Sequence, residues 1–70
     1  MQTVSQHYIN GITDAREEYE AYGMADASDR LANIESTLKR FAGADSEVGQ
    51  YLRGERDFWR NKIKKAKINA

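Results

Sequence analysis

The 70-residue sequence contains no cysteine and no proline, and it has no long apolar run. Without cysteine, neither disulfides nor thiolate metal sites can stabilise the chain, and a reducing cytoplasm is the location that fits this composition. The absence of proline removes the strongest interruption of helices. Because no apolar run reaches the length of a signal-peptide core or a membrane span, we expect a small soluble domain with no membrane partner.

The sequence also has few groups that could carry out catalysis. His7 is the only histidine, and no serine or cysteine nucleophile is placed to use it, although a base and its nucleophile must occur together. Asp14 and Glu18 are four residues apart on one helix face, but a divalent cation normally requires more oxygen ligands. The glycines form no phosphate-binding loop. We therefore expect a protein that is not an enzyme and that holds no metal or cofactor.

The zero net charge hides an uneven distribution of charge along the chain. Residues 1–35 carry seven acidic and two basic side chains, whereas residues 36–70 carry four acidic and nine basic ones. The two halves therefore have charges of −5 and +5. Such a split either favours an acidic partner for the basic half or is neutralised within the fold or an oligomer.

Apolar spacing predicts three helices, over about residues 4–22, 26–42 and 46–67. In the first two helices the apolar residues recur at intervals of four and three, as expected for one buried face. Thr3 and Gln6 have the spacing of a capping box, Asp26 is a candidate cap for the second helix, and Asp45 or Ser46 precedes the third. Gly23 and Gly43 are positioned to end the first two helices.

Links of three or four residues require neighbouring helices to run antiparallel. The predicted architecture is an all-α single domain, either a three-helix bundle or a helical hairpin with a long third helix. A chain of this length buries a small core, so we expect oligomerisation to complete it. We detect no internal repeat or linker in the sequence.

The most informative segment is Gly49–Lys67, because its basic residues form one stripe of the expected third helix. At about 100° per residue, five cations fall within roughly 80° of arc. The basic stripe consists of Arg53, Arg56, Arg60, Lys64 and Lys67. Tyr51 and Trp59 lie on the neighbouring apolar arc, and arginine and aromatic residues are enriched at binding hot spots. The predicted binding residues are therefore Tyr51, Arg53, Arg56, Trp59, Arg60 and Lys64.

The expected helices contain glycines, and the apolar arc of the expected third helix contains charged residues. Gly11, Gly49 and Gly54 each cost about 1 kcal/mol relative to alanine within a helix, which favours a close approach of backbone or ligand at these points. The alternative is that Gly49 belongs to a frayed helix start and that Gly54 faces water. Glu55 and Lys62 project into the apolar arc. Glu55 could pair with Arg30 or Lys39, could pair across an oligomer axis, or could reach solvent. The expected core or oligomer seam contains Leu52, Glu55, Phe58 and Ile63.

Two segments, DRLANIESTLKRFAG and VGQYLRGERDFWRNKI, together with the short chain free of cysteine and proline, resemble the small accessory proteins encoded in early regions of tailed bacteriophages. This resemblance implies a non-enzymatic role in the host cytoplasm, namely binding and blocking a host factor or a defence component. Some phage counter-defence proteins of similar size are helical oligomers that sequester nucleotide second messengers, a role that the arginine and aromatic residues would suit.

Two functional hypotheses follow. The first is a homo-oligomeric protein-interaction module that blocks a host protein through the third helix. The alternative is binding of a nucleotide or nucleic acid by Arg53, Arg56 and Arg60, because guanidinium groups bind phosphate in a bidentate manner. The neutral overall charge is unlike that of dedicated nucleic-acid-binding proteins, which favours the first hypothesis.

Overall fold

The computed structural model describes residues 5–40 and 46–68. These residues form three α-helices, α1 (Gln6–Tyr22), α2 (Ala27–Arg40) and α3 (Glu47–Ile68). No strand occurs in either described range. The prediction of an all-α bundle is confirmed. No helix in the described part of the chain is both long and apolar enough to cross a membrane.

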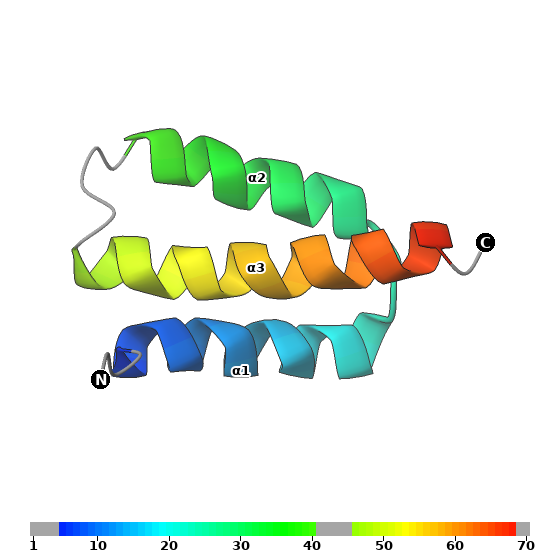
Figure 1. Cartoon of the computed structure of the whole chain (residues 1–70), viewed down its shortest axis with the longest axis horizontal. Helices are drawn as coiled ribbons and strands as arrows, with labels where there is room; N and C mark the ends of the chain where they lie inside the picture. The colour runs from blue at the N-terminus through cyan, green and yellow to red at the C-terminus, as the bar shows by residue number, and fades with distance from the viewer. Residues whose placement is uncertain (1–4, 41–45, 69–70) are drawn as a thin grey trace.

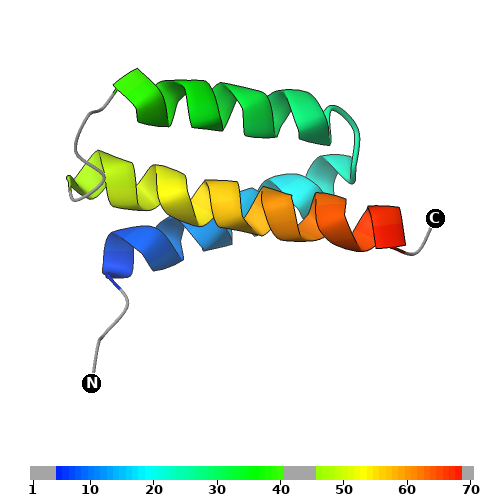
Figure 2. The ribbon, with the colours of Figure 1, turned by 45° about the horizontal axis from the view of Figure 1, so that its top comes forward.

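Helix α3 is the central element of the bundle (Figure 1). Helices α1 and α2 each pack against α3, whereas their own backbones stay apart. Helices α1 and α3 point in the same direction, and α2 runs in the opposite direction on the far side of α3 from α1 (Figure 2). Sequential neighbours are antiparallel, as the short links predicted.

Local hydrogen bonds explain where the helices begin and end. Helix α1 begins with Ser5 as its cap, because the Ser5 hydroxyl accepts a hydrogen bond from the Tyr8 N–H at 3.0 Å. The predicted capping box placed the start two residues earlier. Its Thr3 lies outside the described residues, and the Gln6 side chain bonds Asn10 instead. Gly23 ends α1 as predicted, with a φ of 64° that costs glycine little.

The other two helices begin close to their predicted positions. Asp26 precedes α2 with a φ of 58°, and its carbonyl accepts from the Arg30 N–H at 2.9 Å. The Ser46 hydroxyl accepts from the Gly49 N–H at 3.0 Å and caps α3. The predicted end of the second helix at Ala42, with Gly43 as its stop, lies outside the described residues.

The core is small and centres on Trp59, whose side chain is fully buried against Ala15 and Ala27. Rings from α1 and α3 surround it in edge-to-face contacts. The centroid of Phe58 lies 5.5 Å from that of Trp59, and the centroid of Tyr19 lies 6.3 Å away. Such contacts contribute about 0.5–1.5 kcal/mol each beyond the burial of area. Leu31, Ile34 and Ile63 complete this core.

Arg30 connects all three helices around this core. Its guanidinium donates to the Glu18 carboxylate of α1 at 2.8 Å. The same group lies 5.2 Å from the ring centroid of Tyr22 and 5.9 Å from that of Trp59. Arg30 therefore holds α1 and α2 together through a side chain, where their backbones do not meet.

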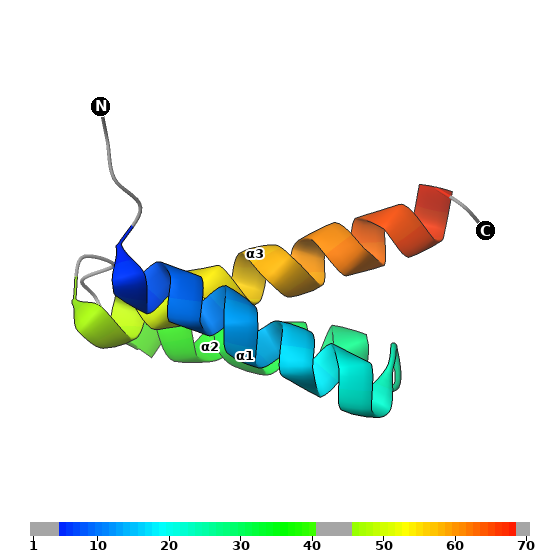
Figure 3. The same cartoon turned by 90° about the horizontal axis from the view of Figure 1, so that it is seen from below.

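Helices α1 and α3 make the closest contact in the molecule, at Gly11 and Gly54, and both glycines are buried. A Cβ on Gly11 would overlap with the carbonyl oxygen of Tyr51, and a Cβ on Gly54 would overlap with that of Tyr8. The expectation that these glycines permit close backbone packing is confirmed. Figure 3 shows α3 crossing α1 along its first half and diverging from it toward its C-terminal end.

Replacing Gly54 by alanine is expected to destabilise the fold by about 2 kcal/mol or more. A backbone carbonyl cannot rotate away from the added methyl group, so the two helices must separate, which outweighs the gain of about 1 kcal/mol in helix propensity. Urea denaturation followed by circular dichroism measures this loss. Ser36→Ala at an exposed position of α2 is the control and should change stability by less than about 0.5 kcal/mol. An unchanged urea midpoint for Gly54→Ala would contradict the close crossing.

Candidate functional site

The predicted basic stripe is on the surface of α3, but its members differ in their partners. Arg53 and Lys64 are exposed and form no ion pair with the described residues. Arg60 is exposed, and its guanidinium lies 2.7 Å from a carboxylate oxygen of Glu35 on α2. Arg56 is half-buried and pairs with the adjacent Asp57 at 3.0 Å. The stripe is therefore only partly neutralised by the chain itself.

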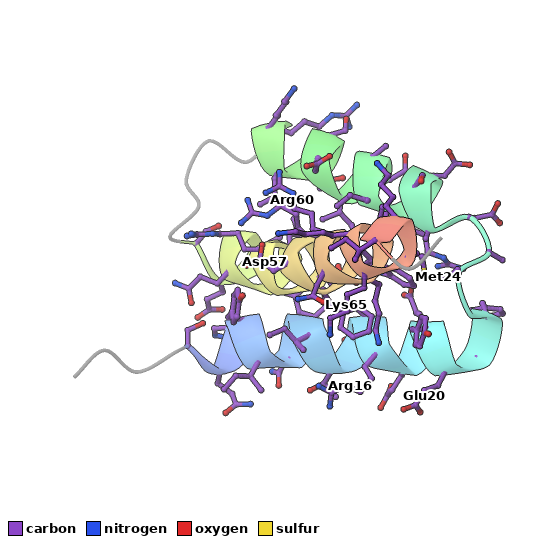
Figure 4. The ribbon with its side chains drawn as sticks, turned by 45° about the vertical axis from the view of Figure 1, so that its right-hand side comes forward. Arg16, Glu20, Met24, Asp57, Arg60 and Lys65 are labelled. Atoms are coloured by element: carbon purple, nitrogen blue, oxygen red, sulfur yellow. The ribbon has the colours of Figure 1, made fainter. Side chains whose placement is uncertain are left out.

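A groove between α2 and α3 collects several of these cations. It has a volume of about 350 Å³ and is lined by Glu35, Leu38, Lys39, Arg56 and Arg60. We call it the cationic groove. Figure 4 shows Arg60 on the side of α3 that faces α2, whereas Lys65 lies on the side that faces α1. Three cations and one carboxylate around an apolar Leu38 suit a negatively charged group that also brings apolar surface.

The two aromatic residues predicted to bind beside the arginines are located elsewhere. Trp59 has no exposed surface and forms the centre of the core. Its predicted role as a surface contact is therefore wrong, and its substitution would test stability instead of binding. Tyr51 faces α1, where its hydroxyl donates to the Asp14 carboxylate at 2.5 Å. Among the described residues, no aromatic side chain lines the cationic groove.

The contact of Tyr51 with Asp14 is half of a reciprocal arrangement. On the other side of the crossing, the Tyr8 hydroxyl donates to the Asp57 carboxylate at 2.6 Å. Each helix thus carries a tyrosine, a glycine three residues later and an aspartate three residues after that. These are YINGITD in α1 and YLRGERD in α3. Residues three apart form one ridge of a helix, so each ridge places its glycine under the other helix.

The expectation that the chain has no internal repeat is therefore wrong. The Tyr–Gly–Asp repeat consists of Tyr8, Gly11 and Asp14 in α1 with Tyr51, Gly54 and Asp57 in α3. A comparison of the sequence with itself would have revealed it, because all three pairs have the same separation along the chain. Gly54 is consequently covered by α1, and the segment Arg53–Arg56 does not form an open ligand site around it.

The repeat also changes the acid–base properties of its tyrosines. Hydrogen bonding to Asp57, followed by burial, raises the pKa of Tyr8 above its ordinary value of 10. Hydrogen bonding to Asp14, followed by burial and the negative charge of Glu55, raises the pKa of Tyr51. Both phenols consequently keep their protons at neutral pH and act as donors, which is what the reciprocal contact requires.

Glu55 is half-buried beside this contact and faces other carboxylates. Burial, followed by the negative charges of Glu18 and Asp14, raises the pKa of Glu55 from 4.5 to about 7. Arg30, one predicted partner, bonds to Glu18 instead. No ion pair to Glu55 from Arg30 or Lys39 occurs in the described part of the chain. Within the described ranges, Glu55 is therefore a half-buried acid that forms no ion pair.

Lys62 lies two turns after Glu55 on the same side of α3, facing α1, and it meets aromatic rings instead of an acid. Its ammonium lies 4.4 Å from the ring centroid of Tyr19 and 5.5 Å from that of Phe58. This position removes the cost of a charge in the apolar arc, because the ring faces attract the cation. Of the predicted seam residues, Phe58 and Ile63 pack against the core, and Leu52 is half-buried.

The remaining candidates for chemistry stay isolated. His7 lies 3.7 Å from the Glu47 carboxylate near the start of α3, and both side chains are substantially exposed. Within the described residues, no cluster of three or more histidine, aspartate or glutamate side chains could hold a metal ion. The cationic groove is thus the feature best suited to binding.

Sequence reasoning did not identify the α2 side of this groove. Glu35 and Lys39 are four residues apart, so a helical reading places them on one face. Their position opposite Arg56 and Arg60 depends on how α2 is rotated against α3, which the packing of Leu31 and Ile34 on the core determines. That rotation has no signature in local spacing.

Comparisons with known proteins add no relative: no family model, no curated protein and no solved structure matches this chain.

The raised pKa of Glu55 predicts that stability falls as the pH rises from 4.5 to 7. Glu55 binds its proton more tightly in the folded state than in the unfolded state. The contribution of this proton to stability is therefore lost once the pH exceeds about 7. Glu55→Gln should therefore stabilise the protein at pH 8 by about 1 kcal/mol, after allowance for the solvent that screens a half-buried group.

Urea denaturation at several values between pH 5 and pH 8.5 would test this prediction. Glu20→Gln, at an exposed position of α1, is the matched control and should leave the pH dependence unchanged. If the free energies of unfolding of wild type and Glu55→Gln run parallel across this range, Glu55 is not the responsible group.

Proposed function

We propose that this chain is a non-enzymatic interaction protein that binds an acidic segment of another protein through the cationic groove and the part of the basic stripe from Arg53 to Lys64. The surface consists of Lys39 on α2 with Arg53, Arg56, Arg60 and Lys64 on α3. The observation that carries this proposal is that the described residues supply fewer carboxylates than cations at this surface. Glu35 and Asp57 pair with two arginines, while Arg53 and Lys64 remain exposed and unpaired among the described residues.

Repulsion between neighbouring cations supports the presence of an external partner. Arg60 is four residues from both Arg56 and Lys64 on α3, so like charges adjoin at both spacings. A carboxylate-rich segment would relieve this repulsion, and Leu38 supplies apolar area within the groove. Clustered cations also speed the encounter with an acidic partner.

A protein partner is favoured over a nucleotide or nucleic acid because of where the aromatic residues lie. Ligands of that class usually gain affinity from stacking a base on an aromatic ring or on a guanidinium plane. Trp59 is buried, Tyr51 is hydrogen-bonded to Asp14, and no ring from the described part of the chain lines the cationic groove. At this surface the described residues offer such ligands phosphate contacts and guanidinium planes, but no aromatic ring.

The resemblance to phage accessory proteins supplies the class of target, a host factor or a defence component whose working surface would be blocked. We further propose that the working form is a homo-oligomer located in the cytoplasm. The small core around Trp59 and several exposed apolar side chains support self-association.

Fluorescence anisotropy with a labelled 20-residue polyglutamate peptide would test the proposed surface. Reversing two cations, as in Arg53→Glu/Arg60→Glu, should cost about 2 kcal/mol of binding free energy, or roughly 30-fold in affinity. The matched control is Arg16→Glu/Lys65→Glu, which changes the net charge equally on the groove between α1 and α3. The control should lower affinity by less than about threefold.

Three results would contradict the proposal. The peptide could fail to bind, or both double variants could weaken binding equally, which would indicate attraction by net charge alone. Tighter binding of a single-stranded oligothymidine or of ATP to the same surface would favour the nucleic-acid or nucleotide alternative. Circular dichroism of every variant would verify that the helices are retained.

A further inference from the structure

A second groove lies at the end of the bundle where α1 turns into α2. It has a volume of about 410 Å³, and its floor is formed by Met24, Ala27, Ile63 and Ala66. We call it the end groove. Figures 1 and 3 show the last turns of α3 extending past the α1–α2 turn and diverging from α1. Figure 4 shows Met24 beside this end of α3.

Exposed apolar surface is concentrated at this end of the molecule. Among the described residues, three of the five large apolar side chains that are exposed lie here. The exposed fractions are 63% for Tyr22, 39% for Met24 and 71% for Ile68. Clustered apolar exposure of this kind is typical of a surface that another chain covers.

The two walls of the end groove carry opposite charges that do not pair. Asp26 and Asp29 line the side formed by the start of α2, and Lys67 lines the side formed by α3. All three side chains are exposed. The described residues contain no ion pair between Lys67 and either aspartate. The end groove therefore presents an acidic wall and a basic wall around an apolar floor.

We propose that the end groove binds the end groove of a second copy of this chain in a two-fold symmetric dimer. A two-fold contact requires one patch to be complementary to itself, which this groove is in charge and in apolarity. The final turns of the two α3 helices would cross at Ala66, whose small side chain permits a close approach. Lys67 of each copy would then face Asp29 of the other.

The end groove is thus the surface through which the homo-oligomer proposed above would form, and this inference rests on that part of the proposed function. It does not involve Arg53, Arg60 or the polyglutamate peptide. A dimer that fails to bind the peptide would therefore refute the acidic partner and leave the end groove intact. A monomer that binds the peptide would do the reverse.

Sedimentation velocity across a range of about 5–500 µM protein would measure self-association. Wild type should form a dimer, and Ala66→Glu, which places a charge on the groove floor, should raise the dissociation constant at least about 30-fold. Val48→Glu is the matched control, because Val48 is an exposed apolar residue near the opposite end of α3. It should remain as dimeric as wild type.

A charge exchange would identify the facing residues. Asp29→Lys and Lys67→Glu should each raise the dissociation constant at least about tenfold, because like charges then meet at both pairs. An equimolar mixture of the two variants should return it to within about threefold of wild type. In that heterodimer each lysine again faces an acid. Circular dichroism and urea denaturation would show that the single variants remain folded.

Several outcomes would overturn the inference. A wild-type monomer at the highest concentration would exclude the dimer. Dimerisation that survives Ala66→Glu, or that is lost equally in Val48→Glu, would place the interface elsewhere. If the mixture of charge variants stays monomeric, Asp29 and Lys67 do not face one another across the dimer axis.

Discussion

The direct approach of two backbones at Gly11 and Gly54 is the constraint on which the remaining structure depends. Because neither residue has a Cβ, each glycine accommodates a carbonyl group of the opposite helix. This contact fixes both the separation and the rotation of α1 against α3. With that rotation set, Trp59 points into the centre of the bundle, and the basic stripe of α3 faces away from α1, toward α2 and solvent.

The charges follow from the same geometry. Arg30 is drawn to Glu18 and to the rings of Tyr22 and Trp59, so it is not available to Glu55. Glu55 is left among acids beside the crossing, with its pKa near neutrality. On the opposite side of α3, Glu35 and Asp57 neutralise only part of the cationic surface. The molecule therefore combines a well-packed helix crossing with two unfavourable charge arrangements, namely Glu55 among carboxylates and the partly neutralised cations of α3. Such arrangements are typical of places where function or a partner opposes stability.

Much of the fold could be predicted from local sequence. The spacing of the apolar residues predicted three helices, and Gly23 and Ser46 marked two of their ends. The described boundaries agree with this prediction to within about two residues. Local spacing could not predict which helices touch, because the closest pair, α1 and α3, is separated along the chain by all of α2. The same limitation applies to the candidate site. The stripe on α3 was readable at 100° per residue, whereas the burial of Trp59 and the arrival of Lys39 depend on packing between helices.

The Tyr–Gly–Asp repeat has a consequence for how copies of this chain recognise one another. Because α1 and α3 present the same ridge, the chemistry that joins them would equally join α1 to α1, or α3 to α3, of another molecule. The short turn and the helix between them give the intramolecular pair a high effective concentration, so the self-contained fold prevails in dilute solution. An α1–α2 turn too short for α1 to reach α3 of its own chain would remove that advantage and turn the same six residues into an exchangeable contact between chains.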